Sequence, residues 1–190
     1  FLDQRDNRQM IRNIARGMRV ANICGYTGGF TVSALAGGAT EVITIDSAGP
    51  ALEEAARNLR LNGMQPEKNP LVKEDMFTWI EKADKAGFDL VILDPPSMAK
   101  NRTENSRAIK AYGKLNRGAA DLLKPGGFLF TASCSTHVSR EDFLETVMNA
   151  VVQVGRVPRL LQEVHHSADH PVVLGHHESR YLHGLLLQVS

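Results

Sequence analysis

Polar and reactive residues recur directly after short apolar runs of the chain. The glycine-rich segment 24–29, Asp46, Asp75, Asp94 and Cys134 each follow such a run. If the runs are parallel strands of one sheet, their carboxyl ends share an edge, and these side chains meet in one crevice. Carboxylates, a flexible backbone turn and a thiol at one edge could bind a polar ligand and carry out nucleophilic chemistry.

Strand-like runs alternate with longer stretches of helical spacing. The strands are predicted at residues 20–24, 42–46, 71–74, 90–94, 128–133 and 185–189. Turns at 62–63 and 125–127 are predicted to end two helices, and Ser139 is predicted to cap the start of another. Residues 164–179 are predicted to form a loop. This order predicts an α/β fold with a doubly wound, mostly parallel sheet.

The composition is that of a globular domain. Of the 190 residues, 43% are hydrophobic and 23% are charged, and this length suits a single domain, 1–190. The longest apolar runs are far too short to span a membrane, so no membrane partner is predicted. Two cysteines are too few for a disulfide framework, which favours a reducing, cytoplasmic location. The start at Phe1, without a methionine or a secretory signal, suggests a C-terminal piece of a longer protein.

A basic stripe lies between residues 100 and 124. It contains Lys100, Arg102, Arg107, Lys110, Lys114, Arg117 and Lys124. Only Glu104 and Asp121 oppose it in the same segment. Such a stripe can follow the phosphates of a nucleic acid, although the net charge of the chain is only +1. On charge alone, the solvated face of a helix is the favoured interpretation.

The segment after the first predicted strand has the character of a ligand-binding turn. Tyr26 and Thr27 precede Gly28 and Gly29. Glycine permits a tight turn in which backbone amides approach a ligand closely. These four residues are therefore predicted to bind a cofactor.

Two carboxylates indicate which cofactor. Asp46, followed by Ser47, could accept hydrogen bonds from both hydroxyls of a ribose, or could instead cap the next helix. Asp75, followed by Met76, could accept from an adenine amino group. The dinucleotide fingerprint and the Walker lysine are both absent from the turn. S-adenosylmethionine (SAM), which needs no phosphate cradle, is therefore the predicted cofactor.

The run Asp94-Pro95-Pro96 follows the fourth predicted strand. Proline has no backbone donor, so the carbonyls of this loop are free to accept from the amino group of a base. Asp94 is also expected to contact the cofactor. One hypothesis is a methyltransferase that acts on an exocyclic base amine. The aromatic residue that usually ends such a motif is missing, because Ser97 and Met98 follow the prolines.

Cys134, which follows the fifth predicted strand, favours a different chemistry. Carbon 5 of cytosine is a poor nucleophile, and attack of a thiolate at carbon 6 activates it by covalent catalysis. Asp94 could then hold N3 of the base with its carboxyl group. This predicts an RNA (cytosine-5) methyltransferase with Cys134 and Asp94 as catalytic residues, whereas Cys24 is interpreted as a packing residue. A binding module without catalysis is a third hypothesis.

The combined motifs resemble one known family, the bacterial large-subunit ribosomal RNA cytosine-5 methyltransferases. The resemblance runs in order over nearly the whole chain and rests on segments 1–5 (FLDQR), 26–30 (YTGGF), 94–96 (DPP), 133–135 (SCS) and 168–172 (ADHPV). It implies a class I, Rossmann-like sheet of seven strands with the last strand antiparallel. It also implies Cys134 as the nucleophile, Asp94 as the base-binding acid and ribosomal RNA as the partner. Family members carry a PUA-type RNA-binding domain upstream, so this sequence is expected to be the catalytic domain without it.

Further contacts follow from the same motifs. Pro95, Pro96, Lys100 and His170 are predicted to bind the substrate, and His170 is included because it lies in segment 168–172. Gln4, Arg5 and Arg8 either contact the cofactor or RNA or have a structural role. The histidines between 165 and 177 match no zinc-binding spacing, so no metal is predicted. The group that removes the proton from carbon 5 is not identified.

Overall fold

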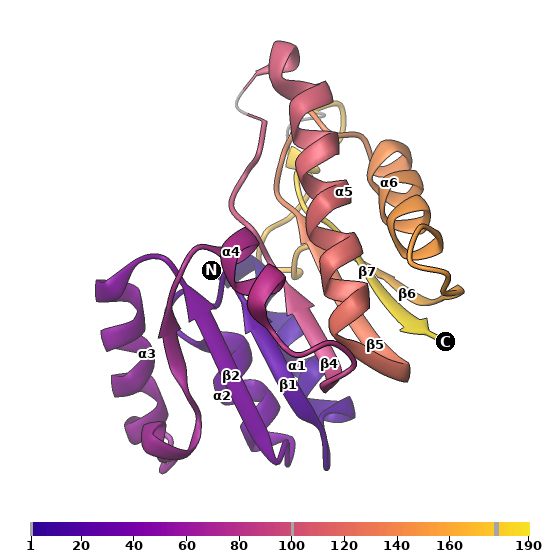
Figure 1. The fold of residues 1–190 in the computed structure, drawn as a ribbon. Coiled ribbons are helices and arrows are strands. Elements are labelled where there is room, and N and C mark those ends of the chain that lie inside the picture. Colours follow the sequence, from indigo (N-terminus) through magenta and orange to yellow (C-terminus); the bar gives the residue numbers. More distant parts are fainter. Residues whose placement is uncertain (1, 100, 177–178) are drawn as a thin grey trace.

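The chain folds around a seven-stranded sheet in the order β3-β2-β1-β4-β5-β7-β6 (Figure 1). The computed structural model describes residues 2–99, 101–176 and 179–190, apart from the side chain of Arg102. The strands are β1 Arg19–Ile23, β2 Glu41–Asp46, β3 Leu71–Lys73, β4 Phe88–Leu93, β5 Leu123–Ser133, β6 Pro158–Val164 and β7 His183–Val189. β7 pairs antiparallel with β5 and β6, and the other pairs are parallel. The predicted fold class is confirmed.

Helices cover both faces of the sheet (Figure 1). They are α1 Arg5–Ile14, α2 Gly29–Ala36, α3 Gly49–Leu61, α4 Met76–Lys82, α5 Asn105–Leu122 and α6 Arg140–Val152, with 3-10 helices at Leu2–Gln4, Pro66–Lys68 and Arg102–Glu104. Ile11 of α1 and Phe30 of α2 belong to one apolar core. Trp79 of α4, Tyr112 of α5 and Phe143 of α6 belong to the other. Burial of these side chains holds the sheet between two layers of helices.

The central strands are buried on both faces of the sheet. Ala21 and Ile23 of β1, and Leu90 to Leu93 of β4, are 0% exposed. Strands of this kind are continuous apolar runs, which is why the sequence predicts them within two residues of their observed ends. No helix among the described parts of the chain is long and apolar enough to cross a membrane.

Two elements differ from the sequence-based expectation. β6 was not predicted, because it is an edge strand whose apolar residues are partly in solvent, with Leu160 47% and Leu161 51% exposed. The turn predicted at 125–127 instead lies inside β5, since α5 ends at Leu122 and β5 begins at the next residue. The pairing of β5 with β4 shifts register there, and Gly126 has a φ of 81°.

Candidate active site

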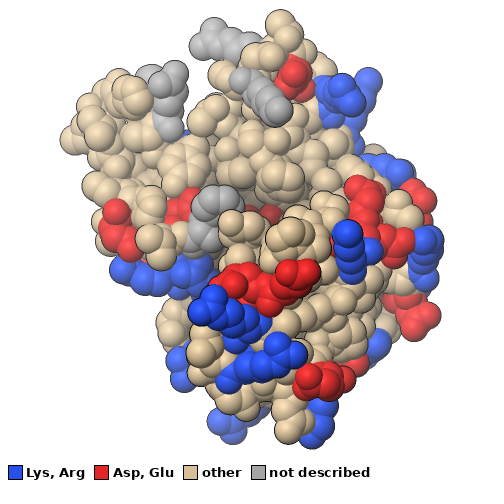
Figure 2. All heavy atoms as spheres, turned by 90° about the vertical axis from the view of Figure 1, so that its left-hand side faces the viewer, with Lys and Arg blue, Asp and Glu red and all other residues tan. Residues whose placement is uncertain are grey.

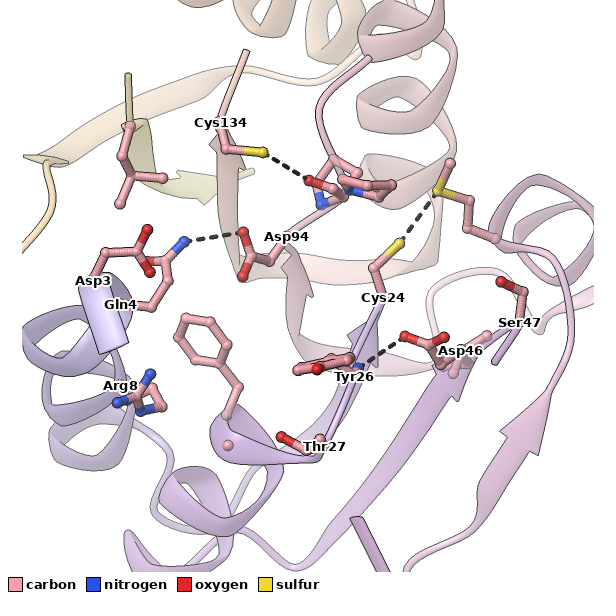
Figure 3. Close-up of a pocket in the computed structure, with 18 of the residues that line it drawn as sticks. Asp3, Gln4, Arg8, Cys24, Tyr26, Thr27, Asp46, Ser47, Asp94 and Cys134 are labelled. Carbon is pink, nitrogen blue, oxygen red and sulfur yellow. Dashed lines mark hydrogen bonds between the residues drawn. The ribbon is translucent and has the colours of Figure 1, made fainter. Parts of the chain in front are cut away.

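The carboxyl ends of the parallel strands surround a cavity of about 650 Å³ (Figure 3). This volume lies in the range of small-molecule and cofactor sites. The predicted site residues that line it are Tyr26, Thr27, Gly29, Asp46, Ser47, Asp75, Met76, Asp94, Pro95, Pro96 and Cys134. The structure therefore brings together side chains that follow five different strands, as the strand-end pattern predicts.

The turn after β1 is conformationally strained. Cys24 and Tyr26 have positive φ angles of 61° and 48°, which residues with a side chain rarely adopt. Hydrogen bonds fix the turn: Gly25 N donates to Ile45 O at 2.9 Å, and Gly28 N donates to Gly25 O at 2.8 Å. Strain held in place by surrounding structure is typical of functional sites.

Gly28, which was predicted to bind the cofactor, is not among the residues that line the cavity. It is the N-cap of α2 with a φ of 77°. A Cβ atom added there would lie 3.1 Å from Ala55 Cβ of α3. Glycine is therefore required at this position because the turn packs closely against α3.

Asp46 fixes the turn and lines the cavity as well. Its Oδ2 accepts from Tyr26 N at 2.9 Å, and its Oδ1 accepts from Ala48 N at 2.9 Å. Each carboxylate oxygen has two lone pairs, so both oxygens keep acceptor capacity for a ligand. The two interpretations drawn from sequence, backbone capping and ribose binding, are compatible at this residue.

Asp75 and Met76 form another wall of the cavity. Asp75 Oδ1 caps α4 by accepting from Phe77 N at 3.0 Å and Thr78 N at 3.1 Å. Met76 Sδ lies 3.3 Å from Cys24 Sγ, and burial followed by neighbouring carboxylates raises the pKa of the Cys24 thiol far above its ordinary value. Cys24 therefore remains a protonated packing residue at neutral pH.

Asp94 is the most perturbed carboxyl group of the cavity. Burial raises its pKa to about 6, and the hydrogen bond that Gln4 donates acts in the opposite direction. Gln4 Nε2 lies 3.0 Å from Asp94 Oδ1. A carboxyl group with such a pKa can both release and take up a proton near neutral pH, as acid–base catalysis requires.

Cys134 lies on the opposite side of the cavity from Asp46 (Figure 3). Its Sγ is a donor to Pro95 O at 3.7 Å. Burial raises its pKa to about 11, and the charge of Asp94 acts in the same direction. The thiol is therefore protonated in the free protein and has to lose its proton when it attacks.

Residues near the start of the chain also line the cavity. Leu2, Asp3, Gln4 and Arg8 contribute the wall next to Asp94. Asp3 Oδ2 accepts from Tyr181 OH at 2.9 Å, which ties this segment to the C-terminal part of the chain. The sequence offers a cofactor or RNA contact, or a structural role, for Gln4 and Arg8, whereas for Leu2 and Asp3 its only signal is the resemblance at segment 1–5.

Other predicted substrate contacts lie elsewhere. His170 is not a lining residue; its Nδ1 lies 3.2 Å from Asp169 Oδ1. Its loop contacts the 3-10 helix before α1 instead, with Ser167 N donating to Asp3 O at 2.8 Å. Lys100 lies outside the described residues. No cluster of three metal-ligating side chains occurs in the described part of the chain.

The basic stripe is partly paired. Lys114 forms an ion pair with Glu81 at 2.8 Å, and Lys124 forms one with Asp89 at 2.7 Å. The face shown in Figure 2 carries acidic and basic side chains close together. Because Glu81 pairs with Lys114 of α5, and Lys124 belongs to β5, the positive charge of α5 is weaker than the number of basic residues in the stripe suggests.

The cavity fits S-adenosylmethionine. Asp46 offers acceptors at the end of β2, Met76 and Phe30 supply apolar surface, and the strained turn exposes backbone at the start of a helix. The sheet order and this cavity at its carboxyl edge define the chain as a Rossmann-like, SAM-dependent methyltransferase.

Comparison with known proteins gives the family. A family model described as S-adenosylmethionine-dependent methyltransferase matches residues 1–172, and the chain belongs to this family. It is 44% identical over 192 residues to a ribosomal RNA large subunit methyltransferase of Deinococcus radiodurans, covering 100% of this chain and 47% of the relative. It is 39% identical over 191 residues to ribosomal RNA large subunit methyltransferase I of Erwinia tasmaniensis, covering 100% and 48%.

A solved structure agrees with this assignment. A crystal structure described as a methyltransferase complexed with SAH is similar with a TM-score of 0.87 and 26% identity, over 99% of this chain and 50% of that one. The chain thus spans about half the length of the relatives it matches. The family assigned from the sequence motifs, a family of cytosine-5 enzymes, is corrected by these matches: the matching family is defined by its cofactor. The relatives' names specify ribosomal RNA of the large subunit but no base.

Proposed function

We propose that this chain methylates large-subunit ribosomal RNA, forming 5-methylcytosine through a covalent cysteine adduct at carbon 6. The observation that carries the proposal is the placement of Cys134 and Asp94 in one cavity. Cys134 Sγ contacts Pro95 O at 3.7 Å, and Pro95 directly follows Asp94. A thiol and a carboxyl group with a raised pKa are the two groups that this chemistry needs.

Asp94 is proposed to accept and donate the protons that move as the adduct forms and breaks down. Asp94 and Cys134 line the same cavity, and the charge of Asp94 acts to raise the pKa of Cys134. In the proposed reaction the Asp94 carboxylate receives the thiol proton as the sulfur attacks carbon 6. The same proton can then pass to N3 of the base, which needs it as the ring loses its aromatic character. Bound S-adenosylmethionine supplies an electrophilic methyl group for carbon 5. Transfer of the carbon 5 proton to a water molecule then re-forms the double bond between carbons 5 and 6 and expels Cys134 as a thiolate. N3 returns its proton to Asp94, which passes it back to the thiolate.

Pro95 and Pro96 are proposed to shape the substrate side of the cavity. The Pro95 carbonyl accepts from the Cys134 thiol in the free protein. When the thiol has reacted, this carbonyl becomes available to the amino group of the cytosine, because a carbonyl oxygen has two lone pairs and proline offers no competing donor. The loop would thus exchange one partner for another during the reaction.

The substrate class is proposed from the relatives. Both relatives described above carry names that specify ribosomal RNA of the large subunit. Residues of α5 that have no acidic neighbour in the sequence, such as Arg107 and Lys110, are proposed to contact its phosphates. A cytoplasmic location, where ribosomal RNA is modified, forms part of the same proposal.

Nucleoside mass spectrometry tests the proposal. The chain and SAM are incubated with unmodified large-subunit ribosomal RNA, and the RNA is digested to nucleosides. We expect 5-methylcytidine in the reaction with the wild-type chain and none with Cys134→Ala. A methylated adenosine or guanosine that persists in Cys134→Ala would instead support methylation of an exocyclic amine through Asp94-Pro95-Pro96.

A further inference from the structure

The two serines that flank Cys134 have a role that the reaction above does not use. Along the end of β5, side chains alternate between the two faces of the sheet. Ser133 and Ser135 are fully buried on the face that carries Tyr112. Cys134 packs against the opposite core and faces the cavity. The serines thus anchor the backbone on one face while the thiol is presented on the other.

Hydroxyl groups form a continuous chain behind the thiol, buried at Ser133, Tyr112 and Ser135 and ending at the exposed Ser97. Ser133 Oγ donates to Tyr112 OH at 3.0 Å, Tyr112 OH lies 3.0 Å from Ser135 Oγ, and Ser135 Oγ lies 3.2 Å from Ser97 Oγ. Ser97 Oγ donates to Ala99 O at 3.1 Å. One direction of donation satisfies every hydroxyl, because each donates once to the next. Tyr112 itself is fully buried and packs edge-on against Phe143, with ring centroids 5.4 Å apart.

Ser135 also fastens the loop that carries the Asp-Pro-Pro motif. Its Oγ accepts from Met98 N at 2.9 Å and lies 3.4 Å from Ala99 N. One side chain therefore joins the end of β5, where Cys134 sits, to the loop that follows Asp94. In a buried setting these bonds cannot be exchanged for bonds to water, so they hold both segments in one arrangement.

We propose that Ser135, held by Tyr112, is a positioning residue that fixes the Cys134 thiol relative to Asp94 and the Pro95 carbonyl. This inference rests on the proposed function, in which Cys134 attacks the base and Asp94 handles the proton. Effective nucleophilic attack requires the reacting groups to be held near contact distance, and small displacements are costly. Neither serine nor Tyr112 touches the substrate in this scheme.

The test compares Ser135→Ala and Tyr112→Phe with Ser139→Ala. Ser139 is a matched control, because it caps α6 through Asp142 N at 3.0 Å and lies outside the hydroxyl chain. The first measurement is the alkylation rate of Cys134 by iodoacetamide between pH 7 and 10, followed by peptide mass spectrometry with Cys24 as internal reference. The second is methyl transfer to large-subunit ribosomal RNA, analysed as kcat and as KM for SAM.

Ser135→Ala is expected to lower kcat by about 10- to 100-fold, with less than about a 2-fold change in KM for SAM, since misplacement affects the reacting groups and not the cofactor. Cys134 alkylation is expected to become faster at pH 8, because the loosened loop exposes the thiol, while Cys24 is unchanged. Tyr112→Phe is expected to act in the same direction, and Ser139→Ala is expected to change neither quantity.

Wild-type alkylation profiles and kcat in both Ser135→Ala and Tyr112→Phe would overturn the inference. If Ser135→Ala does not fold, Tyr112→Phe, which removes a single oxygen, decides alone. The alkylation measurement needs no methyl transfer. A wild-type chain that forms no 5-methylcytidine would therefore overturn the proposed function, while the alkylation profiles still decide whether the hydroxyl chain positions the thiol.

Discussion

The side-chain amide of Gln4 donates a hydrogen bond of 3.0 Å to Asp94 Oδ1 across ninety positions of the sequence. Gln4 is 3% exposed, and its Oε1 accepts from Asn7 Nδ2 at 2.6 Å. The amide therefore has a fixed orientation, with its donor directed at the carboxylate. Through this bond the segment before α1 controls the protonation of the carboxyl group at the end of β4.

Replacement of Gln4 by leucine tests that control. The amide stabilises the charged form of Asp94, so its loss should raise the pKa of Asp94 above its value of about 6. The measurement is the pH titration of the Asp94 carboxyl carbon by NMR. Gln9→Leu is the control, because Gln9 bonds its helix neighbour Asn13 at 3.0 Å in an exposed pair. Equal titration curves for the two variants would contradict the prediction.

The raised pKa of Asp94 also predicts how stability depends on pH. Because the folded-state pKa, about 6, lies above the ordinary value of 3.8, folding favours the protonated form, and the wild-type chain loses stability as the pH rises through this interval. Asp94→Asn removes this cost. We expect the variant to be about 1–3 kcal/mol more stable than wild type at pH 8 and nearly equal at pH 4, by urea unfolding.

Asp89→Asn serves as a comparison, because its effect on folding stability at pH 8 should have the opposite sign. Burial acts to raise the pKa of Asp89, but hydrogen bonds from Lys124 and from Arg19 N outweigh it, and the pKa is lowered. Its carboxylate therefore stabilises the fold above pH 4 and this contribution is lost as the pH falls. The Asp89 variant should be less stable than wild type at pH 8. If Asp94→Asn were instead less stable than the wild type at pH 8, the prediction would be contradicted, and the Asp94 carboxylate would have to be well solvated in the folded protein.

The sequence was informative where one side chain has one physical role. Leu90 to Leu93 are buried on both faces of the sheet, so their apolar run identified β4. Ser139 accepts from Asp142 N at 3.0 Å, as its N-cap position predicted. The strand-end pattern also brought Asp46, Asp94 and Cys134 into one cavity. These features follow from local periodicity and from the geometry of parallel sheets.

Long-range contacts could not be read from the sequence. Nothing near Gln4 in the sequence indicates that its partner is Asp94. The apolar residues of β6 show no alternation of buried and exposed positions, because the strand lies at the edge of the sheet. Gly28 shows a related limit: a ligand-binding turn and close helix packing both require glycine, and only the distance to Ala55 separates them. Tyr112 gave no signal, since a buried aromatic residue of a helix is usually only part of the core.

Asp46 provides a test of the cofactor site. Asp46→Ala removes the proposed ribose acceptors together with the anchor of Tyr26 N, so we expect SAM binding to weaken by about 2–5 kcal/mol in calorimetry. Asp46→Asn keeps one acceptor oxygen, so its affinity for SAM should lie between those of the wild type and Asp46→Ala. Glu53→Ala on the exposed face of α3 is the control. Unchanged affinity in Asp46→Ala would place the ribose elsewhere.

The two cysteines allow a direct test of covalent catalysis. RNA that contains 5-fluorocytidine traps the adduct, because fluorine at carbon 5 cannot leave as a proton and the sulfur is not expelled. The wild-type chain should form a covalent complex with such RNA on a denaturing gel in the presence of SAM, and Cys134→Ala should form none. Cys24→Ala should still form it, since the Cys24 sulfur packs against Met76 at 3.3 Å. A complex that requires Cys24 and not Cys134 would move the nucleophile from the end of β5 to the turn after β1. Trapping should also become faster as the pH rises toward 9, because the pKa of about 11 keeps Cys134 protonated at neutral pH and each unit of pH increases the thiolate fraction.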